Sequence, residues 1–158
     1  MSQFAAMAAD TTQPYRVEIR DPRTDQVIRD HNGNPCYVDV LSTASKQGRE
    51  IEKRKRRDLT KRLVRSRSGN IEPDDQVEAN MELLAHLTVR WHLVSPFTGD
   101  VIEVACNPEN AMALYSDTGM EYAYTQVWFA ANSLANFMPP SSPTSSNSQD
   151  GSSPTSGA

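Results

Sequence analysis

Residues 73–92 read PDDQVEANMELLAHLTVRWH, and this stretch sets the expected fold. Proline suits the first turn of a helix, and Asp74 and Asp75 follow it where the positive end of the helix dipole favours acidic side chains. The residues of the expected buried stripe then recur at helical spacing; they are Val77, Met81, Leu84, Thr88 and Trp91. The stretch therefore predicts an amphipathic helix that begins at Pro73 and ends near His92.

The residues before this helix predict a small antiparallel β-meander. In the stretch 15–20, Tyr15, Val17 and Ile19 alternate with charged residues, which is typical of a half-buried strand. The rest of the meander is a turn, a short strand, a second turn and a third strand, expected at 21–25, 26–29, 31–35 and 36–41.

A strongly basic segment lies between the meander and the helix. Residues 46–67 contain eleven of the sixteen Lys and Arg residues but only three acidic ones, so their formal charge is +8 and the rest of the chain carries −12. Ser42 or Thr43 can cap a helix here that runs to about Arg65. Its apolar stripe is narrow and consists of Ala44, Ile51, Leu59 and Leu63, with Lys55 filling one step.

Such a basic helix can bind an anion, an acidic partner or another part of its own chain. Aromatic residues do not interleave with the charges, so base stacking is unsupported. We therefore expect protein contact or a solvated helix face, with nucleic-acid binding by residues 46–67 as the less favoured alternative. The candidate contact residues are Arg54, Arg57 and Lys61.

The C-terminal half predicts a hairpin and two more helices. Residues 93–95 and 101–105 flank a turn that contains Gly99. Asn107 and Pro108 then suit the start of a short helix to about residue 115. Thr118 and Glu121 form a capping-box pattern for the last helix, which is expected to run to Met138. Its expected inward positions are Val127, Ala131, Leu134 and Met138.

These patterns predict an α+β fold, mainly helical, with an N-terminal meander, about four helices and a short hairpin. We expect a flexible N-terminus at 1–13, one domain at 14–138 and a disordered tail at 139–158, because the tail is rich in Ser and Pro and poor in apolar residues. No run of residues is long and apolar enough to suggest a membrane span.

The sequence shows no pattern typical of catalysis or of metal or cofactor binding. The two cysteines, Cys36 and Cys106, lie far apart, and His86 and His92 are six residues apart, which is not the spacing of a helical metal pair. Phosphate-binding loops and hydrolase motifs are absent from the sequence. We therefore expect a protein that acts by binding, with no enzyme activity, cofactor or metal.

Aromatic residues gather in the C-terminal part of the chain. Most of them should fill the core, but a fold this small cannot cover every apolar face. Large aromatics are also the residues that anchor protein interfaces. The candidate anchors are Tyr115, Trp128 and Phe137. Trp128 is expected at the edge of the helical stripe, and Phe137 near the end of the last helix, where a helix is least covered.

The motifs from Trp91 to Phe137 follow a distinctive order. A tryptophan ends a helix, a hairpin with a Gly turn follows, and Pro108-Glu109-Asn110-Ala111 begins the next helix. The last helix carries Gln126-Val127 and ends in Asn136-Phe137. This order of motifs resembles the C-terminal half of phage tail assembly chaperones. The strand followed by a Ser-rich entry to a basic helix, at 41–57, also resembles this family. The chain differs in having Asp117-Thr118-Gly119 where an aromatic residue usually precedes the last helix.

The resemblance implies a role in virion assembly. Members of this family hold the long helical tape-measure protein soluble and help tail-tube subunits to assemble around it, and they are absent from the finished particle. For this chain it implies the tape-measure protein and the tail-tube protein as partners, and the host cytoplasm as the location. A structural virion component remains an alternative, and self-association is compatible with either role.

Overall fold

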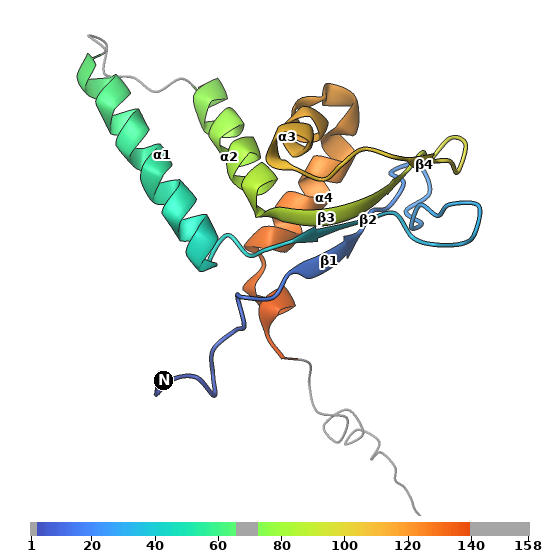
Figure 1. The fold of residues 1–158 in the computed structure, drawn as a ribbon, viewed down its shortest axis with the longest axis horizontal. Coiled ribbons are helices and arrows are strands. Elements are labelled where there is room, and N and C mark those ends of the chain that lie inside the picture. Colours follow the sequence, from blue (N-terminus) through green and yellow to red (C-terminus); the bar gives the residue numbers. More distant parts are fainter. Residues whose placement is uncertain (1–2, 66–72, 140–158) are drawn as a thin grey trace, which may run out of the picture.

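The computed structural model describes residues 3–65 and 73–139 (Figure 1). Four strands, four α-helices and two 3-10 helices are described. They are β1 (Tyr15–Glu18), β2 (Tyr37–Val40), α1 (Lys46–Arg65), α2 (Pro73–Leu87), β3 (Thr88–Val94), β4 (Val101–Ile102), α3 (Pro108–Ser116), η1 (Thr118–Met120), α4 (Glu121–Asn132) and η2 (Leu134–Phe137). The predicted α+β class is confirmed, with the N-terminal meander, the hairpin and the helices in the expected order. Residues 66–72, where the sequence predicts that the basic helix has ended, and almost all of the predicted tail lie outside the described residues.

The four strands form one antiparallel sheet in the order β1-β2-β3-β4. The meander therefore pairs with the hairpin, although α1 and α2 separate them in sequence. As the alternation predicts, Val17 and Ile19 are buried, and Val38 and Val40 of β2 lie on the same side with no exposed surface. The predicted strand at 26–29 is reduced to isolated bridges, which join Arg20 to Val27 and Arg29 to Pro35.

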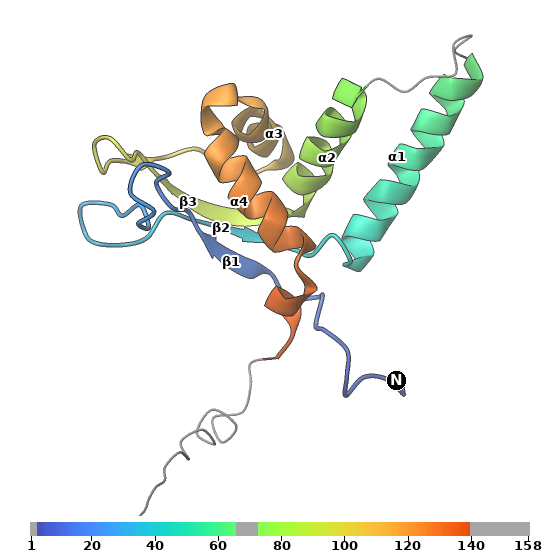
Figure 2. The same cartoon turned by 180° about the vertical axis from the view of Figure 1, so that it is seen from behind.

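The helices α2, α3 and α4 lie on one side of the sheet (Figures 1 and 2). Helix α4 packs on β1 and β2 and buries Ala123, Val127 and Ala131. Helix α2 packs mainly on α3 and contributes Leu84 and Leu87, which have no exposed surface. In both views α1 lies at the edge of the molecule beside α2 and diverges from it.

The predicted helix at 73–92 is wrong at its C-terminal end. Helix α2 stops at Leu87, and β3 begins at Thr88 with no loop between them. Val40 of β2 pairs with Thr88. The Thr88 hydroxyl donates to the carbonyl oxygen of Leu84 at 2.8 Å and so satisfies an acceptor in the last turn of the helix. Trp91 is thus a strand residue, and its indole N–H donates to the carbonyl of Val104 at 2.8 Å. Strand pairing across the sheet outweighs the helical spacing of Thr88 and Trp91.

Helix α1 begins later than predicted, because its cap is Ser45. The side-chain oxygen of Ser45 accepts from the backbone N–H of Gly48 at 3.1 Å, and its carbonyl accepts from Arg49. Gly48 is required here because a Cβ atom would lie 2.5 Å from the carbonyl oxygen of Thr43. Of the predicted stripe, Ile51 is buried and Leu59 is half-buried against the α2 side.

The predicted last helix is divided into three pieces. Asp117, and not Thr118, caps the first piece, because its carboxylate accepts from the N–H of Gly119 at 2.9 Å. Helix α4 ends at Asn132, where the carbonyl of Ala131 accepts from the backbone N–H of Thr43 instead of continuing the helical ladder.

The break after α4 also corrects the expected inward face. Leu134 and Met138 were expected to point inward, but they are 50% and 48% exposed, because η2 does not continue the α4 register. Val127 and Ala131, which precede the break, are buried as predicted.

Candidate partner-binding surfaces

An apolar pocket of about 290 Å³ opens between the sheet and the helical layer. Its walls come from β2, β3 and β4, from the turn that joins β3 to β4, and from α3, η1 and α4. Apolar side chains make up most of this lining; they include Val38, Leu93, Ile102, Leu114, Met120 and Tyr122. Two features set the pocket apart from a core cavity. It is open to solvent, and Phe97 at its rim is 80% exposed.

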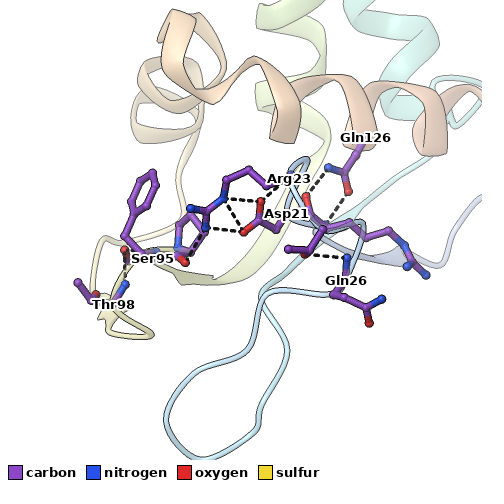
Figure 3. A network of polar contacts seen from close by, with 10 residues as sticks. Asp21, Arg23, Gln26, Ser95, Thr98 and Gln126 are labelled. Atoms are coloured by element: carbon purple, nitrogen blue, oxygen red, sulfur yellow. Dashed lines mark hydrogen bonds and ion pairs between the residues drawn. The ribbon is translucent and has the colours of Figure 1, made fainter.

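The turn that carries Phe97 is held by an ion pair from the meander (Figure 3). Arg23 donates to the Asp21 carboxylate at 2.7 Å and to the carbonyl of Pro96 at 3.2 Å. The guanidinium also lies over the Phe97 ring, 5.1 Å from its centroid. The hydrogen bonds from Arg23 lower the pKa of Asp21, so the pair is charged at neutral pH.

Backbone contacts fix the same turn from the other side. Ser95 Oγ accepts from the N–H groups of Phe97 and Thr98, and Gly99 has the positive φ of 78° that closes the turn. The His31 ring lies 2.9 Å from the Asp100 carboxylate and lowers its pKa. Phe97 is therefore an exposed apolar side chain on an ordered turn, which is the arrangement of an interface anchor.

The meander and α4 are joined next to this turn. The Gln126 side chain accepts from the backbone N–H of Arg20 at 2.8 Å and donates to the Arg20 carbonyl at 2.9 Å. Gln126 thus pairs with the backbone as a neighbouring strand would (Figure 3). The two hydrogen bonds of Gln126 therefore fix the position of α4, which forms one wall of the pocket.

The structure buries two of the three aromatic candidates. Tyr115 is only 1% exposed and its hydroxyl lies 2.7 Å from Thr88 Oγ1, while Phe137 is 5% exposed and packs edge-on against Tyr15 at 6.0 Å. The expected exposure of Phe137 is wrong, because the N-terminal segment covers η2, with the N–H of Asp10 donating to the Phe137 carbonyl at 2.7 Å. Neither ring is accessible on the described surface.

Trp128 keeps the position expected for it at the edge of the helical stripe. Its side chain is partly exposed and stacks on Tyr124 with ring centroids 6.2 Å apart. Tyr124 in turn lies 5.8 Å from Tyr115, so the three rings form one aromatic row from the core to the surface. Phe137 lies outside this row.

The basic candidates Arg54, Arg57 and Lys61 are exposed on α1. Within the described residues, only two basic side chains of this helix pair with a carboxylate. Lys55 pairs with Glu82 of α2, and Arg56 lies 4.0 Å from Glu52 of its own helix. The candidates thus form a surface separate from the aromatic row and from the apolar pocket.

A polar network covers the other face of the sheet, and its role is structural. Asp39 of β2 lies between Arg16 of β1 and Arg90 of β3, at 2.9 Å and 2.6 Å. Burial would raise the pKa of Asp39, but the hydrogen bonds from the two arginines outweigh burial and lower it. Tyr37 stacks on His92 beside them, at 6.0 Å. These pairs tie the three strands together.

The described residues hold no cluster of three or more His, Cys, Asp or Glu side chains that could bind a metal ion. Among the same residues, no helix is both long enough and apolar enough to cross a membrane.

Comparison of the chain with models of protein families, with curated proteins and with solved structures finds no match.

The sequence pointed to the basic helix, but it did not point to the apolar pocket. The pocket lining comes from six elements, and only tertiary packing brings them together. The sequence did contain one signal for this site, which is Phe97, a large aromatic residue between Pro96 and Thr98 in the predicted hairpin turn. Turns are usually polar and exposed, so an aromatic there indicates an exposed apolar group.

Proposed function

We propose that this chain is a tail assembly chaperone of a tailed phage, which covers apolar helical surface on the tape-measure protein while tail-tube subunits assemble around it. The observation that carries the proposal is the open apolar pocket with Phe97 on its rim. The Gly99 turn followed by the helix start Pro108-Glu109-Asn110-Ala111 supports the choice of family, whereas Trp91 lies in β3 and does not end a helix. On this proposal the protein acts in the host cytoplasm without catalysis and leaves before the particle is complete.

The shape and chemistry of the pocket suit an apolar side chain of an amphipathic helix. A helix presents apolar residues at intervals of three and four, and one or two of them can enter a groove. The Phe97 ring and Ile102, which is 45% exposed, offer further apolar surface beside the opening. The ion pair of Asp21 and Arg23 lies beside the rim, where the Arg23 guanidinium contacts the Phe97 ring and the Pro96 carbonyl. A small apolar centre with a polar rim is typical of contacts that form and later release.

The test is co-expression with the tape-measure protein followed by affinity capture, for the wild type and two variants. Phe97→Ser removes the exposed anchor, and Phe129→Ser removes an aromatic that is 67% exposed on α4 but does not line the pocket. Loss of an anchor of this kind should weaken binding about thirtyfold, which corresponds to about 2 kcal/mol. Both substitutions are on the surface, so unfolding free energies should change by less than about 0.5 kcal/mol.

Equal capture of the two variants would contradict the role of the pocket. Failure of the wild type to bind the tape-measure protein would contradict the proposed partner. Detection of the chain in purified particles would instead favour a structural virion component.

A further inference from the structure

Strand β1 leaves one edge of the sheet open. The sheet order places β2 on one side of β1 and no described strand on the other (Figures 1 and 2). The N–H of Ile19 donates to the carbonyl of Cys36, so the odd-numbered residues of this stretch direct their backbone groups towards β2. The even-numbered residues direct theirs outward, into a groove of about 410 Å³ that Ala130 and Asn136 border on the helical side.

The open backbone groups lie at two positions only. At Arg20 the Gln126 side chain already binds the outward N–H and C=O, at 2.8 Å and 2.9 Å (Figure 3). At Pro14 there is no N–H to donate. Arg16 and Glu18 remain between these two ends, and an open strand edge is a template for pairing with another strand.

The side chains of the same two residues carry opposite charges. Val17 is buried on the helical side, so Arg16 and Glu18 project from the other face of the sheet, where both are exposed. The Arg16 guanidinium is held in place, because its Nε and Nη2 donate to Asp39 and it lies 3.7 Å from the centroid of the Tyr37 ring. Within the described residues, its Nη1 and the Glu18 carboxylate have no hydrogen-bond or ion-pair partner.

We propose that β1 pairs with β1 of a second copy, in the antiparallel register centred on Val17, so that the two sheets become continuous. In this register Arg16 of each copy lies directly opposite Glu18 of the other. Both are outward-facing residues, so each pair exchanges two backbone hydrogen bonds. The two-fold axis passes between the two copies of Val17, and each copy offers the same surface, as a symmetric dimer requires.

A second copy matches this edge better than an unrelated strand does. Opposite charges that face each other across neighbouring strands stabilise the pairing, and this register brings both pairs together. The same register sets Pro14 opposite Arg20 of the second copy. Pro14 has no N–H and the Arg20 backbone is bonded to Gln126, so no N–H loses a partner at either end. The open positions of the two strands therefore match in number and in charge.

The dimer goes beyond the proposed chaperone function and does not depend on it. Arg16 and Glu18 do not line the apolar pocket, and Phe97 lies on a turn at the other side of the sheet.

The experiment is sedimentation velocity on the full chain over a series of concentrations. The measured mass should rise from 17.6 kDa towards twice that value as the concentration increases. Glu18→Pro removes the outward N–H but no bond to β2, so it should stay folded and monomeric. Glu18→Arg sets like charges opposite each other in both pairs and should weaken the dimer at least about tenfold. Glu103→Arg is the matched control, because it makes the same change of charge at an exposed position after β4, on the opposite edge of the sheet. Circular dichroism and thermal unfolding confirm that each variant is folded.

Val17→Cys tests the register. On the two-fold axis the two copies of Val17 form a non-hydrogen-bonded pair with Cα atoms about 4.5 Å apart, which is within the span of a disulfide. Mild oxidation should therefore give a covalent dimer. Ile19→Cys is the matched control, because Ile19 is buried on the same side but lies about 14 Å from its own copy in this register. The wild type, treated in the same way, controls for the native thiols of Cys36 and Cys106.

A wild type that stays at 17.6 kDa at every concentration would overturn the proposal, and so would a dimer that Glu18→Pro leaves unchanged. A dimer that cross-links through Ile19→Cys and not through Val17→Cys would overturn the register. A monomeric wild type that loses the tape-measure protein on Glu18→Pro would assign the edge to a strand of that partner instead. Phe97→Ser should leave the dimer intact, so failure here is distinct from failure of the chaperone proposal.

Discussion

Changing Tyr115 to Phe removes one buried hydroxyl and leaves the ring in place. That hydroxyl lies 2.7 Å from Thr88 Oγ1, which itself lies 2.8 Å from the carbonyl oxygen of Leu84. A threonine has a single hydroxyl proton and a carbonyl can only accept. Thr88 therefore donates to Leu84, and Tyr115 donates to Thr88. This chain of two hydrogen bonds lies at the junction where α2 becomes β3.

The expected cost follows from the burial of these groups. Tyr115 and Thr88 are 1% and 9% exposed, so water cannot readily replace a lost partner. Tyr115→Phe leaves the Thr88 oxygen without its donor and should cost about 1–1.5 kcal/mol, or about 3–6 °C in the melting temperature. Thr88→Val removes both bonds and leaves the Leu84 carbonyl and the tyrosine hydroxyl unpaired, which should cost about 2–3 kcal/mol.

Urea unfolding of the two single variants and the double variant measures the coupling. The double variant should be more stable than the sum of the single losses predicts, by about 1 kcal/mol, because the bond between Tyr115 and Thr88 is counted in both single variants. Tyr124→Phe is the matched control, since its ring packs on Tyr115 and its hydroxyl makes no hydrogen bond within the described residues. Additive losses, or an equal loss in the control, would refute the reasoning.

Two further predictions concern the sheet and the start of α1. Asp39→Asn should cost about 2–3 kcal/mol at neutral pH, because the carboxylate binds Arg16 and a second arginine while it is almost fully buried. The folded pKa of Asp39 is lowered, so its stabilisation is present above the unfolded value of about 3.9 and is lost as pH falls through the folded value. The difference in urea midpoint between wild type and variant should therefore shrink at about pH 3, and a constant difference would contradict the pair. Gly48→Ala should destabilise by about 1–2 kcal/mol in thermal unfolding, since the contact with the Thr43 carbonyl outweighs the gain in helix propensity. Gly119→Ala, whose Cβ would meet only a carboxylate oxygen of Asp117, at 3.3 Å, is the comparison and should cost less than Gly48→Ala, because a side chain can move away and the Thr43 backbone cannot.

Local sequence patterns predicted most of the elements, because those elements depend on neighbouring residues. Asn107 accepts from the N–H of Asn110 at 2.8 Å and caps α3 as expected, with Pro108 in its first turn. The alternation in β1 placed Val17 and Ile19 on the buried side. Within the candidate sites, the same kind of reasoning found the exposed basic residues of α1, since charge density in a helix is visible in sequence.

The ends of two elements and the apolar pocket depended on contacts between distant residues. Thr88 fits a helix by spacing, yet it pairs with Val40 across the sheet, and a strand partner 48 positions away is not visible in a helical period. Helix α4 ends where the backbone N–H of Thr43 donates to the carbonyl of Ala131.

The amino-acid sequence by itself determined the α+β class, the order of the elements and the charge of α1, because propensity, capping and periodicity act over a few residues. Only the tertiary structure decided that Tyr115 and Phe137 are buried and that Phe97 stands exposed beside an apolar pocket. Burial depends on which surfaces meet after the chain has folded, and a helical or strand period does not specify the surface that it will face.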